Sequence, residues 1–126
     1  MKTIQIGKAN ERIFEYLNEV FERFGPINAR RMFGGHGEYH NDVMIALVAD
    51  DVLYLKADSD SSIHFDKLRL SPFEFDKNGK KVTMSYFPAP EAIYDNPNEA
   101  RIWANRAHEA ALRSKRQVNK KQVHET

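Results

Sequence analysis

A run of glycines directly after an apolar segment constrains this chain more than any other feature of its sequence. Met32 and Phe33 are followed by glycine at positions 34, 35 and 37, with only His36 between them. Glycine tolerates backbone angles that a Cβ atom would resist, so a chain with this pattern bends readily between two extended segments. We therefore expect an incoming strand over residues 27–33 to turn at the glycines and to enter an antiparallel meander.

Two apolar runs follow the glycines and are typical of strands. Residues 43–48 form a continuous apolar run, and residues 52–56 form a shorter one. Pairs of Asn and Asp precede each run, and these residues tolerate the positive φ angles of tight turns. A run without alternation belongs to a strand that is covered on both faces. The short turns indicate antiparallel pairing, because parallel strands need longer connections.

Helical patterns stand at both ends of the chain. Apolar side chains recur at helical spacing between residues 13 and 24, and a glycine–proline pair ends that helix. Near the other end, Asn96 is a suitable N-cap, Pro97 suits the first helical position, and Trp103 opens an alanine-rich face. We expect one helix from about residue 9 to residue 24 and a second one that begins at residue 97.

The middle of the chain completes the predicted fold. Residues 63–68 follow a loop with several N-cap candidates, so we expect one or two helical turns there. Residues 73–75 and 82–87 are expected to be strands of a hairpin around Asn78-Gly79. The order of elements predicts an α+β fold, in which a mostly antiparallel five- or six-stranded meander sheet is flanked by an N-terminal and a C-terminal helix.

The composition is that of one globular domain. The chain has 126 residues, of which 41% are hydrophobic and 29% charged, and it has no cysteine. A chain of this length buries roughly two-thirds of the surface that it exposes when unfolded, so folding needs neither a metal nor a disulfide. No apolar run approaches the roughly 20 residues that span a bilayer, and no signal-peptide pattern opens the chain. We expect a cytoplasmic protein without a membrane partner.

Positive charge is concentrated at the C-terminal end. Residues 99–126 carry seven Lys or Arg and three Asp or Glu, although the net charge of the chain is only +1. The apolar repeat fades after residue 113, so we divide the chain into a domain over residues 1–113 and a basic, frayed tail over residues 114–126. The cations that could contact a nucleic-acid backbone are Arg113, Lys115, Arg116, Lys120 and Lys121. We favour a solvated tail over nucleic-acid binding.

No set of residues in the sequence amounts to a catalytic site, so we expect a protein that is not an enzyme and has no cofactor. The glycines precede a strand, whereas phosphate cradles open a helix. Ser85 lies within a predicted strand and lacks a nucleophile elbow. His36, Glu38 and His40 alternate along one strand and would share a face, which leaves metal binding as an alternative. Polar residues near a strand edge explain them more simply, and we assign no metal site.

The apolar run at residues 43–48 points to a partner surface. Two helices suffice to cover one face of the sheet, which would leave Met44, Ala46 and Val48, or the residues that alternate with them, exposed on the other face. Exposed apolar patches of this size mark interaction sites. We therefore expect self-association, as a twofold dimer, or docking onto another protein.

Four motifs, in order along the chain, carry a resemblance to a known family. They are Met32-Phe33-Gly34-Gly35-His36-Gly37, Leu53-Tyr54-Leu55-Lys56-Ala57-Asp58, Met84-Ser85-Tyr86 with Pro90-Glu91, and Trp103 with Ala107 and Ala110. Over residues 10–113 the chain resembles the N-terminal domain of the TfoX (Sxy) family of bacterial competence regulators. The residues that carry the family's structural motif are Met32, Phe33, Gly34, Gly35, Gly37, Tyr54, Lys56, Tyr86, Pro90 and Trp103. The resemblance implies an α+β fold with an antiparallel sheet.

The resemblance also implies a regulatory function. Full-length members of the family carry a second, helical domain and act as transcriptional coactivators beside a cyclic-AMP receptor protein, and we expect this chain to lack that domain. We expect a non-enzymatic regulatory domain that acts through protein–protein contacts in bacterial transcription and competence, with a transcription factor as partner. The alternatives are a nucleic-acid-binding accessory protein that uses the basic C-terminal end, and a small metal- or ligand-binding protein.

Overall fold

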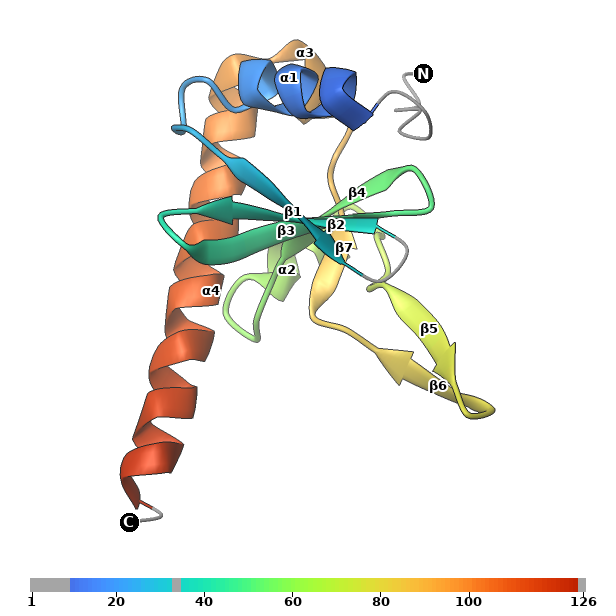
Figure 1. The fold of residues 1–126 in the computed structure, drawn as a ribbon, viewed down its shortest axis with the longest axis vertical. Helices are drawn as coiled ribbons and strands as arrows, with labels where there is room; N and C mark the ends of the chain where they lie inside the picture. The colour runs from blue at the N-terminus through green and yellow to red at the C-terminus, as the bar shows by residue number, and fades with distance from the viewer. Residues whose placement is uncertain (1–9, 33–34, 125–126) are drawn as a thin grey trace.

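An antiparallel meander sheet stands at the centre of the fold, with helices packed against it (Figure 1). The structure, a computed structural model, describes residues 10–32 and 35–124. The five strands of the main sheet lie in the order β1 (Asn28–Met32), β2 (Gly35–His40), β3 (Val43–Ala49), β4 (Val52–Lys56) and β7 (Tyr86–Pro88). Every neighbouring pair is antiparallel. The predicted α+β class is confirmed.

The tight turns of the meander lie where the Asn and Asp pairs predict them. Asn41 and Asp42 join β2 to β3, and Asp50 and Asp51 join β3 to β4. All four residues have positive φ angles between 49° and 64°. Their short polar side chains tolerate this left-handed backbone, which matches the twist of the flanking strands.

A separate two-stranded sheet, β5 (Glu74–Lys77) and β6 (Lys80–Thr83), projects from the main sheet (Figure 1). Its turn is the predicted Asn78-Gly79, where both residues have positive φ. The structure thus has a hairpin at the place where the sequence predicts one.

The single strand predicted over residues 82–87 is interrupted, and this prediction was wrong. β6 ends at Thr83 and β7 begins at Tyr86, so the two strands belong to different sheets. Between them, the N–H of Met84 donates to the carbonyl of Phe73, and the N–H of Phe73 donates to the carbonyl of Tyr86. The chain changes its pairing partner here, and an apolar pattern alone carries no information about partners.

Within residues 10–32 and 35–124, four helices accompany the main sheet. They are α1 (Asn10–Val20), α2 (Ser62–Asp66), α3 (Ala92–Asp95) and α4 (Pro97–His124). The first helix was predicted to reach residue 24, but α1 ends at Val20 and the chain continues as a turn, in which Phe24 N–H donates to the carbonyl of Phe21. The predicted N-cap of α4 is confirmed, because the side chain of Asn96 accepts N–H bonds from Asn98 and Glu99. α3 was not predicted.

The helix α4 is longer than the fading apolar repeat indicates. It continues past residue 113 to His124, so the tail that the sequence predicts as frayed over residues 114–126 is helical through residue 124. Figure 1 shows the last turns of α4 extending beyond the sheet. No described helix is both long and apolar enough to cross a lipid bilayer.

The core lies between the helices and one face of the sheet. α4 packs against β3 and β4, and its alanines Ala100, Ala104 and Ala107 are almost fully buried. Small side chains let the helix approach the sheet closely, and the larger Trp103 fills the space beside them. Phe21 from the turn after α1 and Phe65 from α2 complete the same cluster.

The glycines of the β1–β2 hairpin serve close packing as well as turning. Residues 33 and 34 lie outside the described residues, whereas Gly35 and Gly37 are part of β2. A Cβ atom at Gly35 would overlap the carbonyl oxygen of Val48 on β3, and one at Gly37 would lie 2.8 Å from Sδ of Met32. Gly35 is therefore needed because a backbone atom occupies the space of a side chain, whereas at Gly37 the neighbouring atoms belong to flexible side chains that can move.

We predict that Gly35→Ala destabilises the protein by about 2–3 kcal/mol, because the backbone of β2 or β3 must move to admit the methyl group. Gly79→Ala is the matched control, since Gly79 has a φ of +81° but no atom within 4 Å of the added Cβ. Gly79→Ala should lower the free energy of unfolding by only about 1 kcal/mol, because alanine is less stable than glycine in a left-handed backbone. Urea unfolding measures both; equal losses would contradict the packing explanation.

Candidate functional site

The face of the main sheet that points away from the core carries an apolar cavity. Strand register places Leu47 opposite Tyr54, on the other face from the core residues Val48 and Leu53. A cavity of about 480 Å³ lies at this second face. The residues that line it come from β1, β2, β3 and the base of the β5–β6 hairpin: Met32, Gly35, His36, Leu47, Val48, Ala49, Phe73, Phe75 and Met84.

The expected exposure of the apolar run at residues 43–48 is only partly observed. Ala46 and Val48 are buried on the core side, and Leu47 is buried at the cavity. The prediction that Ala46 and Val48 or their alternates would be exposed was therefore wrong for these residues. Within residues 43–48, Val43 and Met44 are half-buried. Exposed apolar side chains at the second face come from other strands, namely Met32, Val52 and Phe75.

A second group of exposed apolar side chains lies on the helices. Ile63 and Leu68 of the α2 region and Ile102 of α4 are 51%, 50% and 38% exposed. We call these three residues the α2–α4 patch. Phe65 and Trp103 join the two elements beneath it, with ring centroids 4.9 Å apart. The patch was not predicted, because α2 is too short for its exposed and buried positions to be distinguished by periodicity.

Two cations, Lys67 and Arg106, lie on the same two segments as this patch. Arg106 lies over the ring of Trp103 at 4.8 Å, and Lys67 follows Ile63 by one helical turn. Burial lowers the pKa of His64, and the positive charges of Arg106 and Lys67 lower it further. These three side chains therefore share one local surface.

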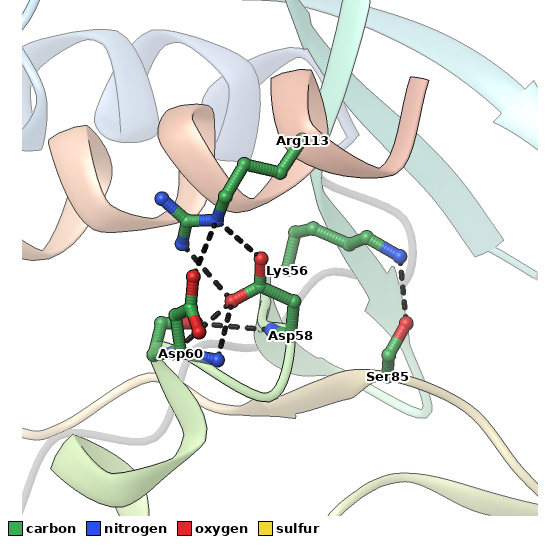
Figure 2. A network of polar contacts seen from close by, with 6 residues as sticks. Lys56, Asp58, Asp60, Ser85 and Arg113 are labelled. Atoms are coloured by element: carbon green, nitrogen blue, oxygen red, sulfur yellow. Dashed lines mark hydrogen bonds and ion pairs between the residues drawn. The ribbon is translucent and has the colours of Figure 1, made fainter. Parts of the chain in front are cut away.

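A polar network ties α4 to the loop between β4 and α2 (Figure 2). Arg113 donates from Nε to Oδ2 of Asp58 at 2.5 Å and from Nη2 to Oδ1 at 3.0 Å, and Asp60 lies 3.5 Å from Nε. The Asp58 carboxylate also accepts N–H bonds from Asp60 and Ser61. The hydrogen bond from Arg113 lowers the pKa of Asp58 to about 2. Arg113, a predicted nucleic-acid contact, is thus a structural clamp in this chain.

The other cations of the basic end are less constrained. Lys115 and Arg116 are exposed on α4. Lys120 and Lys121 lie within the same helix. The structure gives these four residues a regular helical scaffold, and their contact with nucleic acid stays a prediction.

Lys56 is the other cation of the network in Figure 2. Its Nζ donates to Oγ of Ser85 at 2.6 Å and lies 5.1 Å from the centre of the Tyr86 ring. Burial lowers the pKa of Lys56, and the nearby Asp58 acts in the opposite direction. Two residues of the resembled motif, Lys56 and Tyr86, are therefore in contact across β4 and β7.

The remaining motif residues have structural positions. Tyr54 packs on Phe73 with ring centroids 4.8 Å apart, at the second face. Pro90 is buried just before α3, and Trp103 is a core residue of α4. Phe33 and Gly34 lie outside the described residues.

The three polar residues of β2 do not form a metal site. Nδ1 of His40 donates to the carbonyl of Pro26 at 2.8 Å, and Nε2 lies 3.3 Å from the amide of Asn41. Glu38 is fully buried between Ala29 and Ala46 on the neighbouring strands. Within residues 10–32 and 35–124, no group of three or more His, Cys, Asp or Glu side chains is arranged to hold a metal ion.

Glu38 is an uncommon core residue, because its Oε2 atom is buried without a hydrogen-bond partner. Burial raises the pKa of this carboxyl from 4.5 to about 7. A neutral, protonated carboxyl is easier to bury than a charged one. The sequence of β2 does not identify Glu38 as unusual, because its burial depends on how the strand packs.

We predict that Glu38 makes the folded state less stable as pH rises from about 4.5 to about 7, because the unfolded chain releases this proton first. Above pH 7 the loss is complete and amounts to about 3 kcal/mol. In Glu38→Gln this pH dependence should disappear. The free energy of unfolding of the variant should therefore increase relative to that of the wild type as pH rises. Urea unfolding between pH 4.5 and 8 measures it, with Glu19→Gln on the exposed side of α1 as control. An unchanged pH profile would contradict the assignment.

We predict the opposite pH dependence for the clamp. The lowered pKa of Asp58 stabilises the folded state above pH 4, and this contribution is lost as pH falls towards 2. Asp58→Asn should therefore cost about 1–2 kcal/mol at neutral pH, allowing for partial exposure of the pair, and only a small part of that near pH 2. Asp42→Asn is the control, because the Arg30–Asp42 pair is 53% and 86% exposed. Equal effects of the two substitutions would contradict a special role for the clamp.

Comparison with known proteins shows which family shares this arrangement. Residues 19–111 match the TfoX N-terminal domain. The chain is 30% identical to the DNA transformation protein TfoX1 of Aliivibrio fischeri (strain ATCC 700601 / ES114) over 97 residues, which are 77% of this chain and 44% of that protein. It is 28% identical to the protein Sxy of Escherichia coli (strain K12) over 97 residues, 77% of this chain and 46% of Sxy.

The match has a clear extent. It includes the main sheet, the projecting hairpin and α4 as far as residue 111, and the chain spans less than half the length of the two relatives. The predicted resemblance is confirmed: this chain belongs to the TfoX N-terminal domain family, a competence-related regulatory family.

Proposed function

We propose that this protein is a regulatory domain for DNA transformation, and that it acts by binding another protein, expected to be a transcription factor, through the α2–α4 patch. The observation that carries the proposal is the exposure of Ile63, Leu68 and Ile102 on two segments of chain that the Phe65–Trp103 contact holds together. Its relatives include a DNA transformation protein. No step of this function requires a reaction at the protein.

The energetics of the patch favour a protein partner. Complete burial of one large aliphatic side chain stabilises a complex by roughly 1.5–3 kcal/mol, so three such residues can anchor a specific contact. Lys67 and Arg106 beside them supply the polar rim that interfaces of this kind have. The partner should present an apolar side chain to the patch and acidic groups to the rim.

A second copy of this chain fits the patch less well. In a twofold dimer the same patch faces itself, so Lys67 and Arg106 would approach the matching cations of the other copy. Juxtaposed like charges weaken an interface. We therefore propose a different protein as partner. A dimer seen by light scattering at about 50 µM that becomes monomeric in Ile63→Ser would contradict this choice.

We predict that purified protein retains a transcription factor from a nuclease-treated extract of competent cells, and that Leu68→Ser and Ile63→Ser abolish its retention. The matched controls are Met32→Ser and Phe75→Ser, which remove apolar side chains of similar exposure from the second face of the sheet. Melting temperatures should confirm that all variants are folded. Retention that survives in the patch variants but not in the controls would contradict the proposal.

Nucleic-acid binding is the second candidate function, and the observation that favours it is the helical continuation of α4. Residues 114–124 keep Lys115 and Arg116 exposed on a regular helix. Contacts of this kind would be independent of sequence and strongly weakened by salt. Retardation of DNA in low salt that is lost on deletion of residues 114–126, together with nuclease-sensitive retention of proteins, would favour this candidate over the first.

A further inference from the structure

The cavity at the second face of the sheet is not used by the proposed function. The patch residues lie on α2 and α4, which pack on the core side through Phe65 and Trp103. The cavity lies on the other side, where Leu47 and Tyr54 face away from that core. The two features are therefore separated by the sheet itself.

The lining of the cavity is almost entirely apolar. Among the described residues that line it, none is Asp, Glu, Lys or Arg, and His36 is the most polar. Phe73, Phe75, Met32 and Met84 are its largest apolar lining residues beside Leu47. A charged ligand group buried here would lose its hydration and find no opposite charge, which is costly. The chemistry of the wall therefore selects for neutral ligands.

Two neighbouring lining residues of the cavity are small. Gly35 of β2 pairs with Ala49 of β3, and only Ala49 has room for a larger side chain, because the Val48 carbonyl oxygen occupies the space beside Gly35. The larger Met32 and Leu47 line the same cavity. Methionine side chains adapt to ligands of different shapes, because they are unbranched and flexible.

The base of the β5–β6 hairpin forms the opposite wall. Phe73 is held to the main sheet by a backbone bond to Tyr86 and by the contact of its ring with Tyr54, and its ring centroid is 6.2 Å from that of Phe75. Every residue of β5, in contrast, is exposed. The hairpin is therefore attached to the main sheet at its base and exposed along its length, so a ligand between it and the sheet would bury part of its surface.

We propose that this cavity binds a neutral apolar small molecule, of the size of two or three fused or linked rings or a medium-length hydrocarbon chain. Its volume of about 480 Å³ lies within the range of natural ligand sites, roughly 300–1,000 Å³. This site goes beyond the proposed protein contact, and it would give the regulatory domain a second input on the opposite face of the sheet.

The test uses two probes that differ only in charge. N-phenyl-1-naphthylamine is neutral, and 8-anilino-1-naphthalenesulfonate is the same ring system with a sulfonate. Titrated into the full chain, the neutral probe should saturate one site at micromolar concentrations, and the sulfonate should bind at least about tenfold more weakly. Hydrogen exchange at β5 and β6 should slow when the neutral probe is bound.

Variants place the probe in the cavity. Ala49→Leu places a larger side chain at a lining position of the cavity. It should therefore abolish binding of the neutral probe while leaving the melting temperature unchanged or higher. Ile63→Ser is the control, because it removes the most exposed residue of the α2–α4 patch and should leave probe binding unchanged. This control also separates the cavity from the protein-contact proposal, since each site is altered by a different substitution.

Several results would overturn the proposal. Equal binding of the two probes, unaltered binding in Ala49→Leu, or loss of binding in Ile63→Ser would each place the probe elsewhere. A protein that is dimeric at about 50 µM and becomes monomeric in Phe75→Ser would show that a second copy covers the cavity. Saturable, charge-selective binding that Ala49→Leu removes and Ile63→Ser keeps supports it.

Discussion

The packing of α4 on β3 and β4 is the interaction on which the rest of the structure depends. Ala100, Ala104 and Ala107 bring the helix close to the sheet, and this closeness buries Ile45 and Leu55 beneath it. The Arg113–Asp58 clamp then fixes the far end of the contact to the loop after β4. Because one long helix covers a large part of one sheet face, the other face is left to the short hairpin and to whatever binds there.

Local features of the fold were predictable because their causes are local. The four positive-φ residues of the two meander turns and the Asn96 cap each depend on a few neighbouring residues. The break between β6 and β7 has a cause that is distant in sequence, since Phe73 exchanges backbone bonds with both Met84 and Tyr86. Sequence periodicity describes which residues could be strands, and the choice of partner depends on tertiary structure.

In the candidate site, too, local features were predictable from the sequence and tertiary contacts were not. Arg113 was identified as a cation near the end of a helix, but its partner Asp58 is 55 positions away and is brought to it only by the packing of α4. The α2–α4 patch depends on which side of a five-residue helix meets Trp103. The pKa of Glu38 depends on burial of a strand face. In all three cases the sequence shows the residue types, but only the structure shows the contacts that give them a role.

The two faces of the sheet place different physical demands on what binds them. At the α2–α4 patch, apolar side chains stand beside Lys67 and Arg106 and are open to water, so a partner gains by burying them and by matching their charge. At the cavity, a ligand would gain binding free energy by filling a concave apolar space, and a charged ligand would lose its hydration without finding an opposite charge. A ligand in the cavity touches β3, and α4 packs on the opposite face of that same strand. Any displacement of β3 would act first on its packed contact with α4, the helix that carries Ile102 and Arg113.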